Sequence, residues 1–189
     1  MINYKSILER SFNLLHNPSL EWEKISEEKP DMKFIIGSFL LPWLIILTIS
    51  AGLGIYLFTS RFTFTFTYLI GRMILVFITT GSSIMLSAWV ISEAMPNFNL
   101  QKDINKSFAI ICYSITPYMI VATVAYLLPI FGIVKIFAFY SIYVMYMGFP
   151  HIMDIHDNNR IEFTAVSSIA LIIISAFIFF IFHSILGNL

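Results

Sequence analysis

Five long stretches without a charged residue constrain this chain more than any other feature. They cover residues 34–60, 73–92, 107–134, 136–153 and 163–189. A helix that rises about 1.5 Å per residue needs roughly 20 apolar residues to cross the hydrocarbon core of a bilayer. Four stretches reach this length and the fourth in order is close to it, which indicates an integral membrane protein. Composition agrees, because 58% of the residues are hydrophobic and only 12% are charged, whereas soluble domains have about 45–50% and about 25%.

The expected fold is an all-α integral membrane bundle of five transmembrane helices, preceded by short amphipathic N-terminal interfacial helices. The division is a cytoplasmic leader, residues 1–32, and a membrane domain, residues 33–189. The third charge-free stretch is longer than one span requires, and Pro129 with Gly132 closes its helix early, so the next helix starts near Phe131. The predicted spans lie near residues 34–58, 71–93, 107–128, 131–150 and 163–187.

The distribution of lysine and arginine predicts the orientation, because cytoplasmic segments carry an excess of both. With five spans, one side of the membrane holds Lys5, Arg10, Lys24, Lys29, Lys33, Lys102, Lys106 and Arg160. The other side holds Arg61, Arg72 and Lys135. This places the N-terminus in the cytoplasm and the C-terminus outside, and we expect the bacterial inner membrane. The formal net charge is zero, so nothing indicates a nucleic-acid partner.

The leader carries an apolar stripe at helical spacing that includes Ile7, Leu8, Phe12 and Leu14. Asn17 followed by Pro18 is typical of the start of a second helix, which would carry Trp22. Such helices beside a span can lie in the cytoplasmic interface of the membrane. They can equally pack on the cytoplasmic loops as a cap, and both arrangements can hold at once.

The second span has small and hydroxylated residues on one face, bounded by a cation and a carboxylate. At 100° per residue, this face falls within about 80° of arc and holds Arg72, Thr79, Ser83, Ser87, Val90 and Ala94, with Glu93 at its edge. One interpretation is close helix packing through small residues, with both charges at headgroup level. The other is a polar pathway or site inside the bundle, formed by Arg72, Ser83, Ser87 and Glu93.

Residues 112–150 form the most patterned stretch and read as a helical hairpin with a broken first arm. Pro117 cannot donate a hydrogen bond to the carbonyl of Tyr113, so Ser114 or Thr116 is expected to satisfy freed backbone groups. On the second arm Tyr140 and Tyr143 share one face, and Gly148 and Pro150 are expected to end the helix at the cytoplasmic interface. We interpret Tyr113, Pro117, Tyr140, Tyr143, Gly148 and Pro150 as fold-defining residues first. We look for function where this hairpin meets the Ser83–Glu93 face of the second span.

These motifs, in this order, resemble the Yip family of Ypt/Rab-interacting membrane proteins in its short bacterial form. The residues that carry the resemblance are the phrase from Asn17 to Ile25 (NPSLEWEKI), Pro42, Phe108, the phrase from Tyr113 to Pro117 (YSITP), Leu128-Pro129, the phrase from Tyr140 to Tyr143 (YSIY) and Gly148-Phe149-Pro150. The resemblance covers about residues 17–185 and is strongest over 105–150.

The resemblance implies a multi-pass membrane protein. Eukaryotic members belong to the early secretory pathway and are tied to Rab GTPases and vesicle formation. Their longer N-terminal region carries an Asp-Leu-Tyr-Gly-Pro motif that this chain lacks, which argues against a Rab partner here. For bacterial members the resemblance implies no particular activity, and a shared fold does not by itself transfer a function.

Three functional classes remain for the chain. The first is a non-catalytic module that organises or binds partners or lipids, with the bilayer and other membrane proteins or a second copy of the chain as partners. The second is a small transporter or channel subunit that uses the polar face of the second span. An enzyme is the least favoured, because no paired intramembrane aspartates, Gly-x-Ser-x-Gly or His-Glu-x-x-His occur. His151, Asp154, His156 and Asp157 match no established zinc spacing, so we expect no metal, cofactor or catalytic site.

Overall fold

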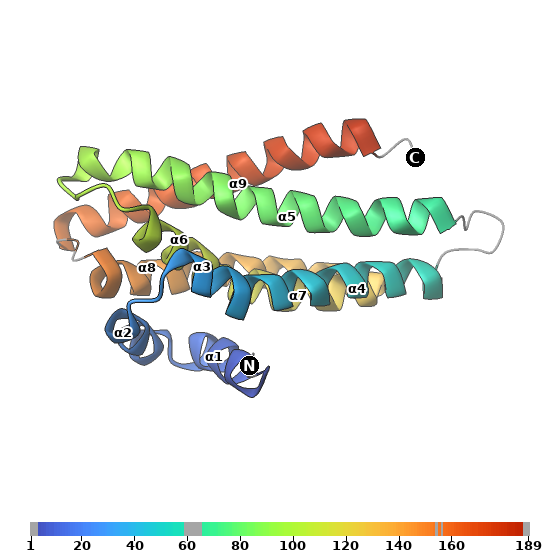
Figure 1. The fold of residues 1–189 in the computed structure, drawn as a ribbon, viewed down its shortest axis with the longest axis horizontal. Coiled ribbons are helices and arrows are strands. Elements are labelled where there is room, and N and C mark those ends of the chain that lie inside the picture. The colour runs from blue at the N-terminus through green and yellow to red at the C-terminus, as the bar shows by residue number, and fades with distance from the viewer. Residues whose placement is uncertain (1–3, 59–65, 154, 156, 187–189) are drawn as a thin grey trace.

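The computed structural model describes residues 4–58, 66–153, 155 and 157–186, and within these ranges it contains helices and no strand. Figure 1 shows the long helices lying along one axis, with the leader helices against one end of the bundle. Four helical segments are long and apolar enough to cross a membrane: Met32–Phe58, Phe66–Phe98, Pro129–Met153 and Asn159–Ile185. A bent pair, Ile104–Ser114 with Thr116–Leu127, makes a fifth when it is counted as one span. The all-α membrane class is confirmed.

The first span joins α3 (Met32–Ile35), η1 (Ile36–Leu40) and α4 (Leu41–Phe58). η1 is a π-turn, in which the N–H of Leu41 reaches back five residues to the carbonyl of Ile36. It ends two residues before Pro42, whose ring would meet the carbonyl four residues earlier in a regular helix. The wider turn therefore accommodates the proline early in this span.

The second span joins α5 (Phe66–Ala94) to a short 3₁₀ turn, η2 (Met95–Phe98). α5 begins five residues before the predicted start at 71, so it includes the last part of the aromatic segment that precedes the charge-free stretch. The span ends at Pro96 and Asn99, and Asn99 takes the left-handed conformation (φ 60°) that asparagine tolerates well.

The third span is broken into α6 (Ile104–Ser114) and α7 (Thr116–Leu127), which bend by 42°. The cause is Pro117, which has no N–H to offer to the carbonyl of Tyr113. The hydroxyl of Thr116 donates to this carbonyl instead, at 2.6 Å. The break predicted from the Tyr-Ser-Ile-Thr-Pro phrase is therefore present, with Ile115 as the residue between the two helices.

The fourth span is a 3₁₀ helix, η3 (Pro129–Phe139), followed by α8 (Tyr140–Met153). The chain turns at Leu128 and Pro129, and Phe131 departs from helical angles (φ −89°, ψ 23°). We expected one regular helix from about residue 131, whereas the outer part of this span is wound more tightly. A 3₁₀ run of 11 residues is long, because runs beyond 3–4 residues are uncommon.

The expectation that Gly148 and Pro150 end the fourth helix is wrong, since α8 continues through both to Met153. Pro150 cannot bond to the carbonyl of Tyr146, but Nε of Arg160 donates to that carbonyl at 2.9 Å. The Arg160 guanidinium also lies 3.7 Å from the centre of the Tyr146 ring. A cation on the next helix thus replaces the hydrogen bond that the proline removes.

The fifth span is α9 (Asp157–Leu186), which packs along α5 and against α8. It begins six residues before the predicted start at 163, which places Arg160 in its first turn. Figure 1 shows α9 diverging from the axis of the other spans toward its C-terminal end.

The leader forms α1 (Tyr4–His16) and α2 (Pro18–Glu28), and α2 packs against α8. Trp22 is completely buried at this contact, and its Nε1 donates to the carbonyl of Val144 at 2.9 Å. Gly148 leaves the space that the indole ring fills, because a Cβ there would lie 2.5 Å from Cε2 of Trp22. The leader is therefore an integral part of the helical bundle.

The apolar residues of α1 are partly buried against the spans and partly exposed. Ile7 and Leu14 are buried against the bundle, and Trp43 donates to the Ser11 hydroxyl at 3.2 Å. Leu8 and Phe12 are exposed. One face of α1 thus packs as a cap on the spans, and the other presents apolar side chains of the kind that enter a membrane interface.

Candidate functional site

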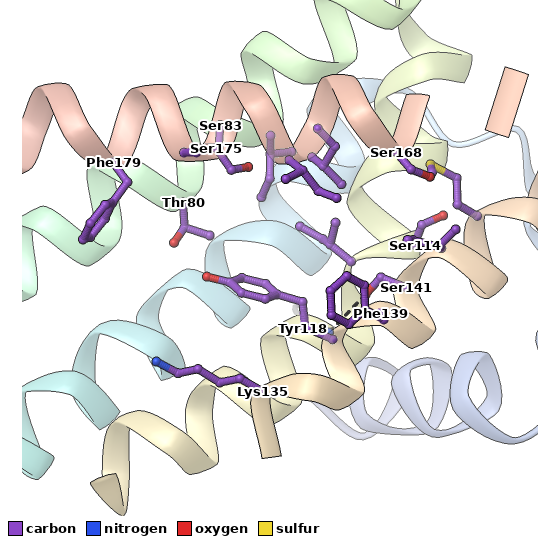
Figure 2. A pocket seen from close by; sticks show the side chains of 18 of the residues that line it. Thr80, Ser83, Ser114, Tyr118, Lys135, Phe139, Ser141, Ser168, Ser175 and Phe179 are labelled. Atoms are coloured by element: carbon purple, nitrogen blue, oxygen red, sulfur yellow. Dashed lines mark hydrogen bonds between the residues drawn. The ribbon is translucent and has the colours of Figure 1, made fainter. Parts of the chain in front are cut away.

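A cavity of about 470 Å³ lies between α5, the α7–η3–α8 hairpin and α9. Its floor is deep in the bundle, since Ile84 and Met145 are each 1% exposed. Its mouth is flanked by Phe139, Ile172 and Phe179, which are largely exposed. Figure 2 shows the lining side chains, with α9 on one side of the cavity and η3 and α8 on the other. The three residues at the mouth lie within membrane-spanning segments, so the exposed rim of the cavity belongs to the spans.

Hydroxyl groups from every wall face this largely apolar cavity. They belong to Thr79, Thr80, Ser83, Ser114, Tyr118, Tyr126, Ser141, Ser168 and Ser175. Several donate within their own helix: Thr79 to the carbonyl of Leu75, Ser83 to that of Thr79 and Ser168 to that of Thr164, each at 2.6–2.7 Å. These hydroxyls keep free lone pairs, so they can still accept hydrogen bonds from a bound molecule.

The break in the third span supplies the polar inner end of the cavity. Ser114 lines the cavity and is 1% exposed, and its hydroxyl has no hydrogen-bond partner within the described residues. Beside it, the N–H of Tyr118 in the first turn of α7 bonds to the Ser141 hydroxyl at 3.3 Å. A buried hydroxyl without a partner costs about 1–3 kcal/mol, which a ligand at this end would relieve.

Lys135 is the one charged residue that lines the described cavity, and it lies at the opposite end. Its ammonium group is 5.4 Å from the centre of the Tyr126 ring. The Tyr118 side chain interacts with Tyr126 and with Thr80 at the same end. Figure 2 shows Tyr118 and Lys135 both extending toward this end, with Thr80 nearby.

The contact with Tyr126 offsets only part of the cost of placing Lys135 in a span. An exposed cation–π contact contributes about 0.5–1 kcal/mol, whereas a lysine at the centre of a spanning helix costs about 2.5–3.5 kcal/mol. Exposure and a long stem reduce that cost. Among the residues that the structure describes, Lys135 forms no ion pair with a carboxylate. An anion at the cavity mouth would therefore find a cation available.

The polar face predicted on the second span is divided in the structure. Ser83 lines the cavity, and Ser87 is fully buried without a hydrogen-bond partner in the described part of the chain. Glu93 forms an ion pair with Lys102 in the loop that follows α5. Arg72 is half-buried near the other end of α5, and neither Arg72 nor Glu93 is among the described residues that line the cavity. Of the four residues, only Ser83 is among the described residues that line this cavity.

A comparison with protein-family models finds the Yip1 domain over residues 12–181 of this chain. The match covers most of the chain, including the first four spans, most of the fifth span and most of the leader. The chain belongs to the Yip1 domain family. No curated protein and no solved structure matched it in the corresponding comparisons. The resemblance drawn from the Tyr-Ser-Ile-Thr-Pro and Gly-Phe-Pro phrases is confirmed, and the protein is a multi-pass membrane protein of the Yip family.

In this Yip1 domain, three of the hairpin residues singled out from the sequence, Tyr113, Tyr140 and Gly148, contact the leader. The Tyr140 hydroxyl donates to the carbonyl of Leu15 at 2.9 Å, and the ring of Tyr143 lies 5.3 Å from that of Tyr140. Tyr113 is buried between Phe39 and Trp22, with ring centres at 4.7 and 6.1 Å. These tyrosines lie on the leader side of the hairpin, whereas the cavity lies on the side that faces α5 and α9.

Arg10 links the leader to Tyr113 by a hydrogen bond, and it forms ion pairs with two glutamates of α2. Its guanidinium donates to Glu28 at 2.5 Å and to the Tyr113 hydroxyl at 3.2 Å, and its Nε lies 3.4 Å from a carboxylate oxygen of Glu21. Burial opposes the charged form, but the hydrogen bond to Glu28 and the proximity of Tyr113 and Glu28 hold the pKa of Arg10 above its ordinary value. Arg10 therefore remains charged and keeps the buried Glu21 paired.

Several cavity residues of this Yip1 domain were not picked out from the sequence. They are Thr80, Tyr118, Tyr126, Lys135, Ser168 and Ser175. A signal was present for two of them, because Ser168 and Ser175 are seven residues apart, on one helix face, within an otherwise isoleucine- and phenylalanine-rich span. Of the loop residues considered for a metal, Asp154, His156 and the side chain of Asp157 lie outside the described residues.

Proposed function

We propose that this Yip-family protein is a non-catalytic membrane module that binds one membrane lipid in the cavity between α5, the hairpin and α9. The observation that carries the proposal is the cavity itself, with about 470 Å³ of space, apolar walls and hydroxyls along its floor. Ligand sites typically have about 300–1,000 Å³ and combine apolar walls with a few polar groups. A mouth flanked by exposed Phe139 and Phe179 suits a molecule that arrives from the surrounding lipid.

The lipid's chain would lie along the apolar wall formed by the hairpin and α9, and its polar linkage would meet the hydroxyls. Ser114 supports this arrangement, because it is a buried donor without a partner at the inner end of the cavity. The serines and threonines that donate within their own helices would add acceptors. No step of this function requires bond chemistry, so the protein acts by holding the lipid.

The alternative function, a small transporter or channel subunit, has one observation in its favour. Broken helices near the middle of a membrane often form substrate sites in transporters, and α6 and α7 are such a pair. A pathway along the predicted face of α5 would have to connect Arg72 with Glu93. Neither residue is among the described residues that line the cavity, and this favours lipid binding over transport. Solute flux through vesicles that contain the purified protein would support the alternative.

For orientation, we propose a cytoplasmic N-terminus and an external C-terminus in a bacterial inner membrane. The excess of lysine and arginine at the leader end supports this orientation. A reporter fused after Leu189 is expected to behave as external, and one fused before the leader as cytoplasmic. A cytoplasmic result for the C-terminal fusion would contradict an odd number of spans. Other membrane proteins, or a second copy of this chain, are proposed partners for the exposed span surfaces.

Filling the cavity is expected to remove the bound lipid. Ser175 lines the cavity from α9 and is only partly buried, so Ser175→Trp would place an indole in the lipid's position without entering the tightly packed core. Native mass spectrometry of the gently released protein should show a lipid adduct on the original chain, reduced about tenfold in the variant, as expected when roughly 1.4 kcal/mol of binding free energy is lost.

The matched control lies two residues away on the same helix. Ile173 is 61% exposed and is not among the cavity-lining residues, so Ile173→Trp adds the same side chain on the outside. This variant should retain the adduct at the original level. Equal adducts in the Ser175→Trp and Ile173→Trp proteins would contradict the proposed site.

A further inference from the structure

The charge at the cavity mouth goes beyond what lipid binding alone requires. Lys135 follows Pro129 by six residues in a 3₁₀ helix, which corresponds to about 12 Å from the turn at a rise of about 2.0 Å per residue. At this depth the stem passes through the region of the acyl chains, and the ammonium can reach the level of the lipid headgroups. An ionisable residue within a span marks a functional site by default.

Among the described residues that line the cavity around Lys135, there are hydroxyl donors and no carboxylates. Within the described lining of the cavity, Lys135 carries the only formal charge, and the other polar side chains are hydroxyls. The hydroxyls of Thr80 and Tyr118 lie at the same end as the ammonium (Figure 2). A cation with neighbouring hydroxyl donors complements an anion with several oxygen acceptors, and a phosphate group has this character.

Taking the proposed lipid binding as its basis, we infer that the occupant is an anionic phospholipid whose phosphate binds Lys135 while its chain lies in the cavity. The ammonium supplies a charge-assisted hydrogen bond, and the face of the Tyr126 ring holds this ammonium beside the mouth. Thr80 and Tyr118 donate to the remaining phosphate or glycerol oxygens. A zwitterionic lipid of the same chain length fits the cavity but brings its own cation close to Lys135.

The test compares two lipids with identical chains. The full-length protein is placed in micelles that contain equal amounts of phosphatidylglycerol and phosphatidylcholine, and the bound lipids are counted by native mass spectrometry. We expect the original chain to prefer phosphatidylglycerol about tenfold, the effect of roughly one charge-assisted hydrogen bond. Lys135→Gln should reduce this preference to near unity while the total bound lipid falls much less, and Lys135→Arg should retain it.

Two controls separate charge at the cavity from charge elsewhere and from free phosphate. Lys106→Gln removes one positive charge in the first turn of α6, away from the cavity lining, and should leave the preference unchanged. Inorganic phosphate should not displace the lipid, because it lacks the chain that occupies the cavity; displacement would assign the site to a free anion and overturn the inference.

The outcomes also distinguish this inference from the proposed function on which it rests. Lipid adducts without preference in the original chain, or a preference that survives Lys135→Gln, would overturn the anionic headgroup and leave lipid binding intact. A lack of adducts that respond to Ser175→Trp would overturn lipid binding itself.

Discussion

Replacing Gly148 with leucine is expected to release the leader from the spans. A Cβ at this position would lie 2.5, 2.7 and 2.9 Å from three ring atoms of Trp22, and real contacts at a Cβ are longer. The indole is completely buried and hydrogen-bonded to Val144, so it cannot rotate away within its site. Losing the packing of a buried tryptophan costs about 3–5 kcal/mol, which corresponds to a change of at least a hundredfold in the docked-to-released ratio.

Trypsin cleavage within the leader measures this ratio, because Arg10 lies within α1 and Lys24 lies within α2. When opening is fast, the rate of cleavage follows the fraction of leader that is released. We expect Gly148→Leu to accelerate cleavage by about two orders of magnitude. Gly71→Leu is the control, since a Cβ at Gly71 meets nothing within 4 Å. Equal cleavage rates in the two variants would show that the leader does not depend on this contact.

The second large effect is expected at Gly54, where α4 crosses α7. A Cβ on Gly54 would lie 1.9 Å from the carbonyl oxygen of Tyr126 and 3.0 Å from its carbon. Because these are backbone atoms, the helices must separate rather than adjust a side chain. Small residues allow such close approach between spanning helices, and inserting a methyl group into a packed contact costs about 1–3 kcal/mol or more. Gly54→Ala should therefore lower the free energy of unfolding by about 3 kcal/mol.

Gly52 provides a matched comparison two residues earlier on the same helix. A Cβ there would lie 2.7 Å from Sδ of Met73, and a methionine side chain can move because it has three rotatable bonds. Gly52→Ala should cost less than about 1 kcal/mol. Unfolding in detergent with increasing denaturant measures both variants under the same conditions. Similar losses for Gly52→Ala and Gly54→Ala would contradict the distinction between backbone and side-chain obstruction.

The contact at Gly148 also shows which features of the fold could be predicted from the sequence and which could not. Charge-free length was enough to predict the membrane class, and Pro117 was enough to predict the broken third span, because both depend on local backbone chemistry. The contact between Trp22 and Gly148 joins residues 126 positions apart, and neither residue's neighbours indicate the other. Gly148 could be recognised as a motif, but the ring that it accommodates could not.

Two helix features differed from expectation, the continuation of α8 through Pro150 and the 3₁₀ winding of η3. Pro150 normally favours the end of a helix, yet α8 continues because Arg160 bonds to the carbonyl that the proline leaves free. The 3₁₀ winding of η3 has no clear signal in its apolar sequence, since Ile, Phe and Val at these positions suit an α-helix in a membrane equally well. Local sequence therefore predicted where both helices lie, but not the 3₁₀ winding of η3 or the residue at which α8 ends.

The candidate site could be predicted only in part. Ser83 was picked out from the hydroxyl pattern of the second span, and the place where this face meets the hairpin was named as a place to look for function. Residues of α5 and of the hairpin do line the cavity. The cavity instead forms around Thr79, Thr80 and Ser83, and it includes α9. Its walls come from several separate helices, which are brought together by packing and not by any single motif.

A photoreactive phospholipid with its reactive group on the acyl chain tests the lipid site most directly. After illumination of the protein in bilayers, peptide mapping locates the labelled residues. Occupation of the cavity predicts strong labelling near Thr80, Ser83 and Ile84, although each is at most 8% exposed. Labelling confined to outward-facing residues such as Ile130 and Ile133, which are 85% and 82% exposed, would contradict it.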